Sequence, residues 1–126
     1  EAVHETKTGV DSLRILTSGP LPPNPAELLN SQRVRDFWPL LLEEYEYVLV
    51  DAPPVLAVTD ASILAPQMDG VIMVTRYGVT RRDQVQQSRE VFRKAKANLI
   101  GVVLNQVKMK GHDYQYYYYS PGKQRA

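Results

Sequence analysis

The chain has no cysteine, only two histidines and no excess of charge of either sign. The absence of cysteine excludes disulfide bonds and cysteine-ligated metal sites, and it fits a reducing compartment. His4 and His112 stand apart with no acidic residues at metal-ligand spacing, so we assign them no role. A net charge of +1, without a dense block of lysine and arginine, gives no reason to expect nucleic-acid binding.

Long apolar runs are also missing. No run approaches the roughly 18 residues needed to span a membrane, and no signal peptide is visible. The chain has 126 residues, of which 44% are hydrophobic and 23% charged, as in an ordinary globular protein. This length suits one domain or part of one. Because the chain begins with Glu1 rather than Met, we expect it to be cut from something longer.

The first part of the chain predicts a short strand, a stiff loop and a helix start. Residues 1–12 are polar, as in a connector, and residues 13–16 (LRIL) predict a strand. Four prolines within residues 20–25 predict an extended loop, because proline cannot lie inside a sheet. The loop ends at a helix start, where Asn24 can cap the helix and Glu27 can reach back as a capping-box acid.

The middle of the chain predicts a helix and a buried strand. Residues 31–45 carry apolar side chains at helical spacing, and Pro39 inside them predicts a kink or two short helices. Residues 47–50 (YVLV) are continuously apolar, which is typical of a strand covered on both faces. A short helix is expected after Asp60.

The last part alternates strands with a helix. Residues 71–75 (VIMVT) predict a buried strand, residues 80–97 a helix with Thr80 as its cap, and residues 99–107 a strand that runs out at Asn105. Such alternation is typical of βαβ units, in which right-handed helical crossovers join parallel strands. We therefore predict an α/β fold, mainly a parallel sheet with flanking helices.

Polar side chains follow the strands of this predicted parallel sheet. Asp51 follows the run VLV, Arg76 and Tyr77 follow VIMVT, and Asn105 ends the last strand. In open α/β sheets, ligands bind beyond the carboxyl ends of the strands. The convergence of these side chains at strand ends therefore predicts a ligand site.

An acid such as Asp51 at the end of a buried strand is costly unless a charged or polar group meets it. A magnesium ion at the mouth of a phosphate site, often bound through a water, is one such group. This is the Walker B role in P-loop proteins. Pro53 and Pro54 would then stop the strand and hold the next loop extended. The alternative is that Asp51 caps a turn, since Asp-x-Pro is common in loops.

The combination of motifs resembles the bacterial tyrosine kinases of capsule and exopolysaccharide synthesis (BY-kinases), a family of deviant-Walker P-loop ATPases. The segment LVDAPP matches the family's Walker B, in which apolar residues precede Asp-x-Pro-Pro. The segment GPLPPNPAELLNS follows the pattern G-x-x-P-P-N-P-x-E-L-L-x-S, which is close to a family signature. The resemblance runs on through VIMVTRYGVT and GVVLNQV to the C-terminal tyrosines, so it covers nearly the whole chain.

The resemblance implies roles for the residues at the strand ends. Asp51 would support Mg²⁺, directly or through a water, in an ATP site, and Asn105 would contact the adenine base. The alternative for Asn105 is a turn former at the end of a strand. Asp60 is either a helix N-cap or an active-site acid. Three arginines either meet phosphates or a neighbouring subunit or lie on a solvated face: Arg76, Arg81 and Arg82.

Two motifs of the family are absent from this sequence. The P-loop, G-x-x-x-x-G-K-[ST], has no match, since the sole Gly-Lys pair, Gly122–Lys123, precedes glutamine. The second aspartate motif, apolar residues followed by Asp-x-Asp-x-Arg, is also absent. Both lie upstream of this region in the family, so we expect residues 1–110 to be the C-terminal part of a P-loop kinase domain. Without the P-loop cradle of N–H groups and its lysine, this chain alone is expected to be inactive.

Five of the eight tyrosines crowd together near the C-terminus: Tyr114, Tyr116, Tyr117, Tyr118 and Tyr119. Neither a strand nor a helix period accounts for this spacing. One interpretation is an aromatic patch packed on the domain or on a partner. The interpretation we favour is a flexible low-complexity tail over residues 111–126 with accessible hydroxyl groups. In the BY-kinases such a cluster is the autophosphorylation substrate, presented in trans to a neighbouring subunit, and the resemblance implies that all five tyrosines are phosphorylation sites here.

The resemblance thus predicts an ATP- and Mg²⁺-dependent protein-tyrosine kinase that phosphorylates its own tail and regulates polysaccharide polymerisation and export. It implies a homo-oligomer on the cytoplasmic side of the bacterial inner membrane, tethered by a membrane chain-length regulator. Two alternatives stay open: a deviant-Walker ATPase of the positioning or partitioning type, and a non-catalytic interaction module that lacks the P-loop. The tyrosine cluster favours the kinase over the ATPase.

Overall fold

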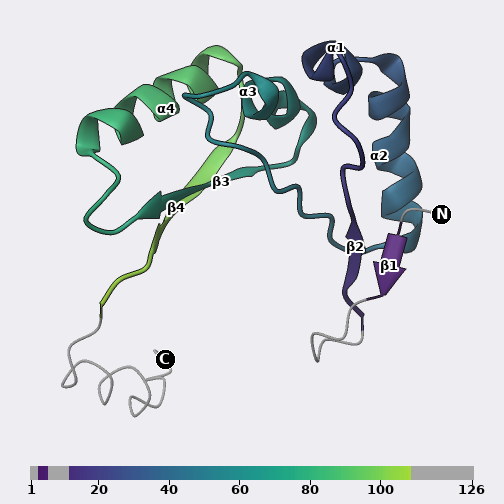
Figure 1. Ribbon diagram of the computed structural model, residues 1–126, viewed down its shortest axis with the longest axis horizontal. Coiled ribbons are helices and arrows are strands. Elements are labelled where there is room, and N and C mark those ends of the chain that lie inside the picture. Colours follow the sequence, from purple (N-terminus) through teal and green to yellow (C-terminus); the bar gives the residue numbers. More distant parts are fainter. Residues whose placement is uncertain (1–2, 6–11, 109–126) are drawn as a thin grey trace, which may run out of the picture. The chain divides into compact units, whose positions relative to one another are not determined.

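The computed structural model describes residues 3–5 and 12–108 of the chain (Figure 1). The chain divides into two compact units, Glu1–Val48 and Leu49–Ala126, each with its own secondary structure. Within the described ranges, no helix is both long enough and apolar enough to cross a lipid bilayer.

The first unit begins with a pair of short strands. Strands β1 (Val3–Glu5) and β2 (Arg14–Leu16) pair antiparallel. The prediction of a strand at 13–16 is confirmed to within one residue, whereas the prediction of a connector over 1–12 is wrong for β1. Three residues are too few to show a period in the sequence, and β1 is a strand because β2 pairs with its backbone.

Two helices follow the proline-rich loop, α1 (Pro25–Leu29) and α2 (Gln32–Glu44). The helix start at Pro25 is confirmed, but Asn24 does not cap the backbone. Its Nδ2 instead donates a hydrogen bond to Glu27 Oε2 at 3.1 Å, so the acid meets the side chain of the expected cap rather than a backbone N–H.

Helix α2 begins at a capping serine and continues through a proline. Ser31 Oγ accepts a hydrogen bond from the Val34 N–H at 3.4 Å. Pro39 lies inside the helix without dividing it, so one helix of 13 residues occupies a region where two short helices were one expectation. Pro39 has no N–H to donate to the Arg35 carbonyl, but the hydrogen bonds on either side keep the helix continuous.

The second unit is a βαβ unit preceded by a short helix. Its elements are, in order, helix α3 (Asp60–Leu64), the 3-10 turn η1 (Ala65–Gln67), strand β3 (Val71–Arg76), helix α4 (Arg82–Lys94) and strand β4 (Leu99–Asn105). Strands β3 and β4 pair in parallel, and α4 is the crossover between them. This confirms the predicted α/β fold and its parallel pairing.

Helix α4 is shorter at both ends than the predicted range 80–97. Arg81 occupies the N-cap position, and its N–H donates a hydrogen bond to Gln84 Oε1 at 2.9 Å. Thr80, the predicted cap, belongs instead to the turn after β3. Lys96 has a φ of 59°, a left-handed conformation that ends the helix.

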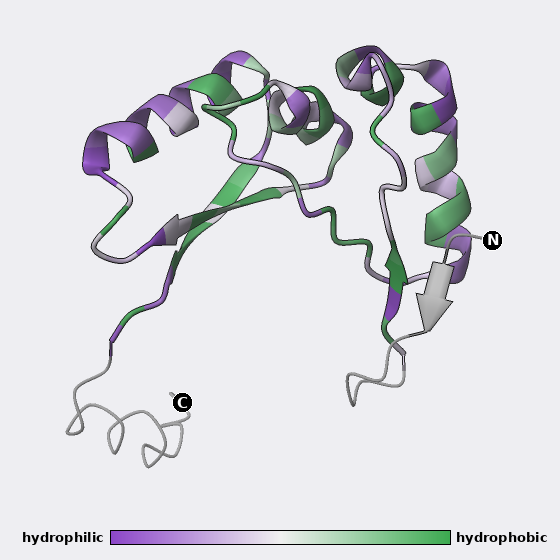
Figure 2. Cartoon of the chain, viewed as in Figure 1, coloured by the Kyte–Doolittle hydropathy of each residue, from purple (hydrophilic) through white to green (hydrophobic). Residues whose placement is uncertain are grey.

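The core of the second unit lies between β3, α4 and the η1 turn. Its buried apolar side chains are Ala65, Met73 and Phe92. Partly buried apolar residues surround them: Val55, Ala61, Val71, Val85, Ala97 and Leu99. In Figure 2 the strands are largely hydrophobic, whereas much of the surface of α4 is hydrophilic, as expected for a helix that buries one stripe.

The two faces of β3 differ in burial. Met73 and Thr75 are buried, whereas Ile72 and Val74, which alternate with them, are 54% and 65% exposed. Since successive side chains of a strand point to opposite faces, one face of β3 is covered and the other is open among the described residues. The strand predicted over residues 71–75 is confirmed, but the prediction that it is buried is correct for one face and wrong for the other.

The predicted strand over residues 47–50 is wrong. This segment has no regular secondary structure, and Leu49 is 91% exposed instead of buried. An apolar, β-prone run forms a strand only when a neighbouring strand pairs with its backbone groups. No described strand pairs with residues 47–50, and β3 and β4 pair with each other alone.

Candidate functional site

The carboxyl ends of β3 and β4 lie side by side. Arg76 and Asn105 are partners in the parallel ladder. Just beyond them, the Tyr77 N–H donates a hydrogen bond to the Asn105 carbonyl at 2.9 Å. The structure therefore brings together three of the four strand-end residues that the sequence singled out: Arg76, Tyr77 and Asn105.

A tight turn after β3 fixes the backbone of Arg76. The Thr80 Oγ1 accepts a hydrogen bond from the Arg76 N–H at 2.9 Å, and the Thr80 N–H donates to the Arg76 carbonyl at 2.9 Å. Gly78 has a φ of +70°, a conformation that residues with side chains rarely adopt. Sequence reasoning missed this role of Thr80, although its position four residues after a strand end, beyond a glycine, is a usable signal.

Asn105 ends β4 with a local hydrogen bond of its own. Its Oδ1 accepts from the Gln106 N–H at 2.7 Å, and Gln106 has a φ of 58°, so the strand runs out at Asn105 as predicted. The Nδ2 group of Asn105 has no partner in the described part of the chain, so it remains a free donor at the strand end.

Asp51 does not lie on a strand. It occupies an exposed coil with Ala52, Pro53 and Pro54. Its carboxylate has no hydrogen bond or ion pair with a residue of the described ranges, and no hydrogen bond joins it to Arg76 or Asn105. The predicted convergence of three strand ends is therefore present for two of them.

The remaining candidates lie in the two helices of this unit. Asp60 is the first residue of α3, one position after the N-cap residue Thr59, so the interpretation of Asp60 as the cap is wrong by one position. Arg81 Nε donates to Asp83 Oδ1 at 3.0 Å, whereas Arg82 is exposed and has no ion pair among the described residues. Residues 12–108 contain no group of three acidic or histidine side chains placed to hold a metal.

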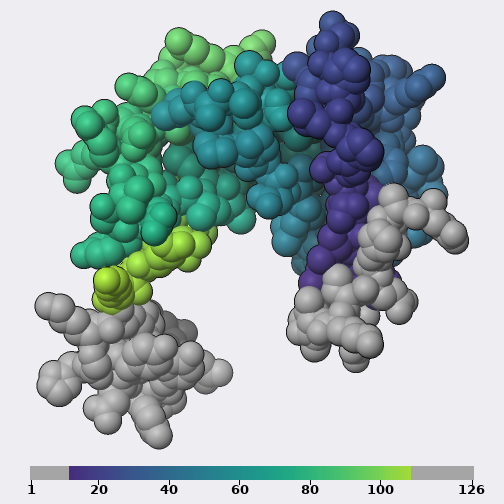
Figure 3. Space-filling view, viewed as in Figure 1, coloured from purple at the N-terminus to yellow at the C-terminus, as the bar shows by residue number. Residues whose placement is uncertain are grey.

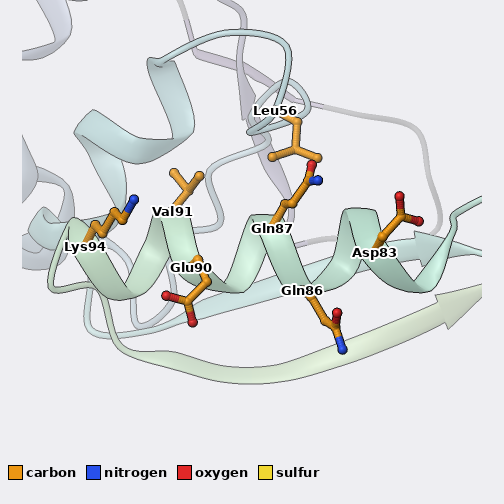
Figure 4. A pocket seen from close by; sticks show the side chains of 7 residues that line it. All are labelled: Leu56, Asp83, Gln86, Gln87, Glu90, Val91 and Lys94. Atoms are coloured by element: carbon orange, nitrogen blue, oxygen red, sulfur yellow. The ribbon is translucent and has the colours of Figure 1, made fainter.

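An open groove of about 490 Å³ lies along α4 (Figure 4). Leu56, in the segment before α3, lines the groove. The other lining residues come from one side of α4: Asp83, Gln86, Gln87, Glu90, Val91 and Lys94. None of the strand-end residues lines this groove, so it is separate from the predicted nucleotide site.

Helix α4 also carries the one acid with a shifted pKa in the described part of the chain. The side-chain hydrogen bond from Arg93 holds the pKa of Glu90 below its ordinary value, and the charges of Arg93, Arg89 and Lys94 add to this. The same bond raises the pKa of Arg93. Both side chains are on the surface, so the pair is a local feature of α4.

The five tail tyrosines lie outside the described residues: Tyr114, Tyr116, Tyr117, Tyr118 and Tyr119. The structure therefore neither confirms nor corrects their predicted role as phosphorylation sites. The choice between a packed aromatic patch and an accessible tail over residues 111–126 likewise stays a prediction.

Known proteins are similar to this chain in sequence and in fold. The tyrosine-protein kinase YwqD of Bacillus subtilis is 41% identical over 106 residues, which are 83% of this chain and 45% of the relative. The putative tyrosine-protein kinase CapB of Staphylococcus aureus is 32% identical over 119 residues, 94% of this chain and 51% of the relative. The solved structure of the chimerical protein CapA2B2 matches 86% of this chain and 47% of its own, with a TM-score of 0.79 and 35% identity. No family model matches the chain.

These proteins define a class of bacterial protein-tyrosine kinases with an α/β fold. Over most of its length the chain is similar to this family, the bacterial tyrosine kinases, as its motifs indicated. It spans about half the length of the first relatives it matches.

Proposed function

We propose that this chain is part of an ATP-dependent protein-tyrosine kinase that phosphorylates its own C-terminal tyrosines and so regulates the polymerisation and export of a capsule or exopolysaccharide. The observation that carries the proposal is a cluster of five tyrosines, within residues 114–119, in a member of a tyrosine kinase family. An ATPase of the positioning or partitioning type has no use for such a cluster. Residues 1–110 belong to the kinase domain, and residues 111–126 form the substrate tail.

Asp51 is the residue we assign to Mg²⁺. Its carboxylate is exposed and unpaired among the described residues, and carboxylate oxygens are ligands that Mg²⁺ prefers, directly or through a water. The donor set therefore fits the metal. When bound, Mg²⁺ neutralises phosphate charge during phosphoryl transfer.

Asn105 and Arg76 supply the other nucleotide contacts in this proposal. The free Nδ2 group of Asn105 can donate a hydrogen bond to a base nitrogen, while its Oδ1 stays bonded to the Gln106 N–H. Arg76 is exposed beside it, and a guanidinium group suits phosphate oxygens. Their backbone pairing holds these two side chains at one edge of the sheet without help from a ligand.

The P-loop has no match in this sequence, so residues 1–126 lack the cradle of N–H groups that binds a triphosphate. Phosphoryl transfer depends on positioning and charge neutralisation. The 126-residue chain alone therefore neither binds MgATP tightly nor transfers phosphate. Isothermal titration calorimetry should detect no binding at micromolar nucleotide, and a micromolar dissociation constant would contradict this.

The kinase works as a homo-oligomer on the cytoplasmic side of the inner membrane, next to a membrane chain-length regulator. The support for this part is the family alone. In the family the tail is presented in trans, and a homo-oligomer supplies the neighbouring subunit that receives it.

The direct test is phosphate transfer by the protein purified from its native cell. With Mg²⁺ and radiolabelled ATP, the label should appear on the tail tyrosines. Asp51→Asn should reduce labelling by about two to three orders of magnitude, since it removes a charged group on the metal. Asp69→Asn, at another exposed acid of the same unit, should leave labelling unchanged. Absence of label transfer by the protein without any substitution would overturn the proposal.

A further inference from the structure

Helix α4 and its flanking residues concentrate positive charge. Between Arg76 and Lys96 lie seven lysines and arginines but only two acids, a net charge of +5, whereas the whole chain carries +1. The other residues of the chain therefore carry a net charge of −4. This segment is the most cationic part of the described chain, so its positive potential attracts anionic ligands.

Three arginines form a stripe along one flank of α4. Arg82, Arg89 and Arg93 are spaced by seven and four residues, which places them within about 40° of one another around the helix axis. We call these three residues the arginine stripe. It is about 16 Å long at the helical rise per residue. All three side chains are exposed, and the buried Phe92 faces another way, into the core.

The arginine stripe has unused capacity for hydrogen bonds. Arg93 pairs with Glu90 at 2.8 Å, but its side chain is still 66% exposed. Arg82 and Arg89 form no ion pair with any residue in the described ranges. An unpaired guanidinium group matches the geometry of phosphate oxygens and can bind two of them at once.

The chain leaves the sheet at the end where α4 begins. The Tyr77 N–H bonds to the Asn105 carbonyl, and Arg82 is five residues beyond Tyr77. In the space-filling view, green atoms of the α4 region form part of the visible surface (Figure 3). Tyr114 is nine residues past Asn105, and nine residues reach at most about 30 Å. The tail tyrosines are therefore within reach of the whole stripe.

The spacing of the tyrosines also suits the stripe. A fully extended chain from Tyr114 to Tyr119 covers about 17 Å, close to the length of the stripe. Unmodified tyrosine brings no charge, whereas each phosphotyrosine brings about −1.5 to −2 at neutral pH. The arginine stripe should therefore bind the phosphorylated tail more tightly than the unphosphorylated tail.

We infer that the arginine stripe of α4 is a binding site for phosphotyrosine, and that its ligand is the chain's own phosphorylated tail. This inference rests on the proposed function, because it needs phosphate on the tail. Binding at the stripe withdraws the phosphorylated tail from the active site of a neighbouring subunit. The site thus stores the product of the reaction on the surface of the enzyme that made it.

The test uses the 126-residue chain and a fluorescent synthetic peptide of residues 111–123, with and without phosphate on its tyrosines. The phosphopeptide should bind, and the unmodified peptide should bind at least about tenfold more weakly. The double variant Arg82→Gln/Arg89→Gln should weaken binding of the phosphopeptide about threefold to tenfold, the range for two exposed ion pairs. The matched double variant Arg33→Gln/Arg35→Gln removes the same charge from exposed positions of the first unit and should change little.

Equal weakening by the two double variants, or equal binding of both peptides, would overturn the inference. Vesicles of phosphatidylcholine and phosphatidylserine provide a second ligand. If the stripe variant loses vesicle binding but keeps phosphopeptide binding, the stripe is a membrane contact and the inference is wrong. Because the peptide is phosphorylated chemically, failure of the stripe is distinct from absence of phosphate on the tail in cells, which contradicts the proposed function instead.

Discussion

Arg76 and Asn105 lie opposite one another at the last rung of the β3–β4 ladder, and the Asn105 carbonyl accepts a hydrogen bond from the residue after Arg76 at 2.9 Å. A cationic side chain and a free amide donor therefore share one edge of the sheet. Their proximity is fixed by main-chain hydrogen bonds and needs no ligand.

Thr80→Ala should destabilise the chain by about 1 kcal/mol, because the Arg76 N–H loses its hydrogen bond to Oγ1. Thr80→Ser keeps the hydroxyl group and should recover most of the loss. Urea unfolding followed by far-UV circular dichroism measures both. An alanine variant as stable as the unmodified chain would show that this hydrogen bond does not hold the turn.

Gly78→Ala should destabilise the chain by about 1–2 kcal/mol, since Gly78 has a φ of +70° and a Cβ is disfavoured there whatever the space. Gly101→Ala is the matched control. A Cβ at Gly101 would meet nothing within 4 Å, and its φ is not in the left-handed range. The same unfolding assay compares them, and equal effects would contradict the role assigned to the turn.

Glu90 should titrate with a pKa below its ordinary range, because Arg93 donates a hydrogen bond to its carboxylate. A lowered pKa means that the stabilisation by this pair is present above the unfolded value, about 4.3, and is lost as the pH falls through the folded value. NMR titration of the Glu90 carboxyl carbon measures the midpoint. Arg93→Gln should move that midpoint upward, and an unchanged midpoint would show that Arg93 is not the cause.

Phe92→Ala should destabilise the chain by about 3–5 kcal/mol, since this side chain is 5% exposed and belongs to the small core of the second unit. Tyr77→Ala, at an aromatic residue that is 55% exposed, is the control and should cost much less. Thermal unfolding measures both. Similar losses for the two variants would contradict the placement of the core.

Phosphate on all five tail tyrosines would add about −8 to −10 charges, enough for self-repulsion to loosen an assembly of subunits. Replacement of the five tyrosines by phenylalanine prevents their phosphorylation, so the subunits of the native protein should stay assembled. Light scattering on phosphorylated and dephosphorylated samples measures its size. A size that is the same in both states would contradict a switch of this kind.

The local signals in the sequence predicted the second unit well. The apolar, β-prone run of β3 and the helical period of residues 82–94 are properties of short segments, so the sequence contains them. The open face of β3 was not predicted, because a continuous apolar run does not show which face another element will cover. The ends of α4 were less predictable. Thr80 is a good capping residue, but its hydroxyl group bonds to Arg76, and Arg81 takes the cap position instead.

The strand predicted over residues 47–50 shows why local signals have a limit. Its residues are as β-prone as those of β3, but β3 has β4 beside it and residues 47–50 have no described partner. Strand formation depends on residues distant in the sequence. The motif around Asp51 is local and indicated the family. The position of Asp51 relative to Arg76 and Asn105 depends on residues distant in the sequence, so the motif could not predict it.

The central claim, that the tail is the substrate of this kinase, is tested most directly by tandem mass spectrometry of the protein from its native cell. Phosphate should be found, in several combinations, on Tyr114, Tyr116, Tyr117, Tyr118 and Tyr119. Asp51→Asn should abolish it. Unmodified tyrosines in cells that are actively exporting polysaccharide would contradict the claim.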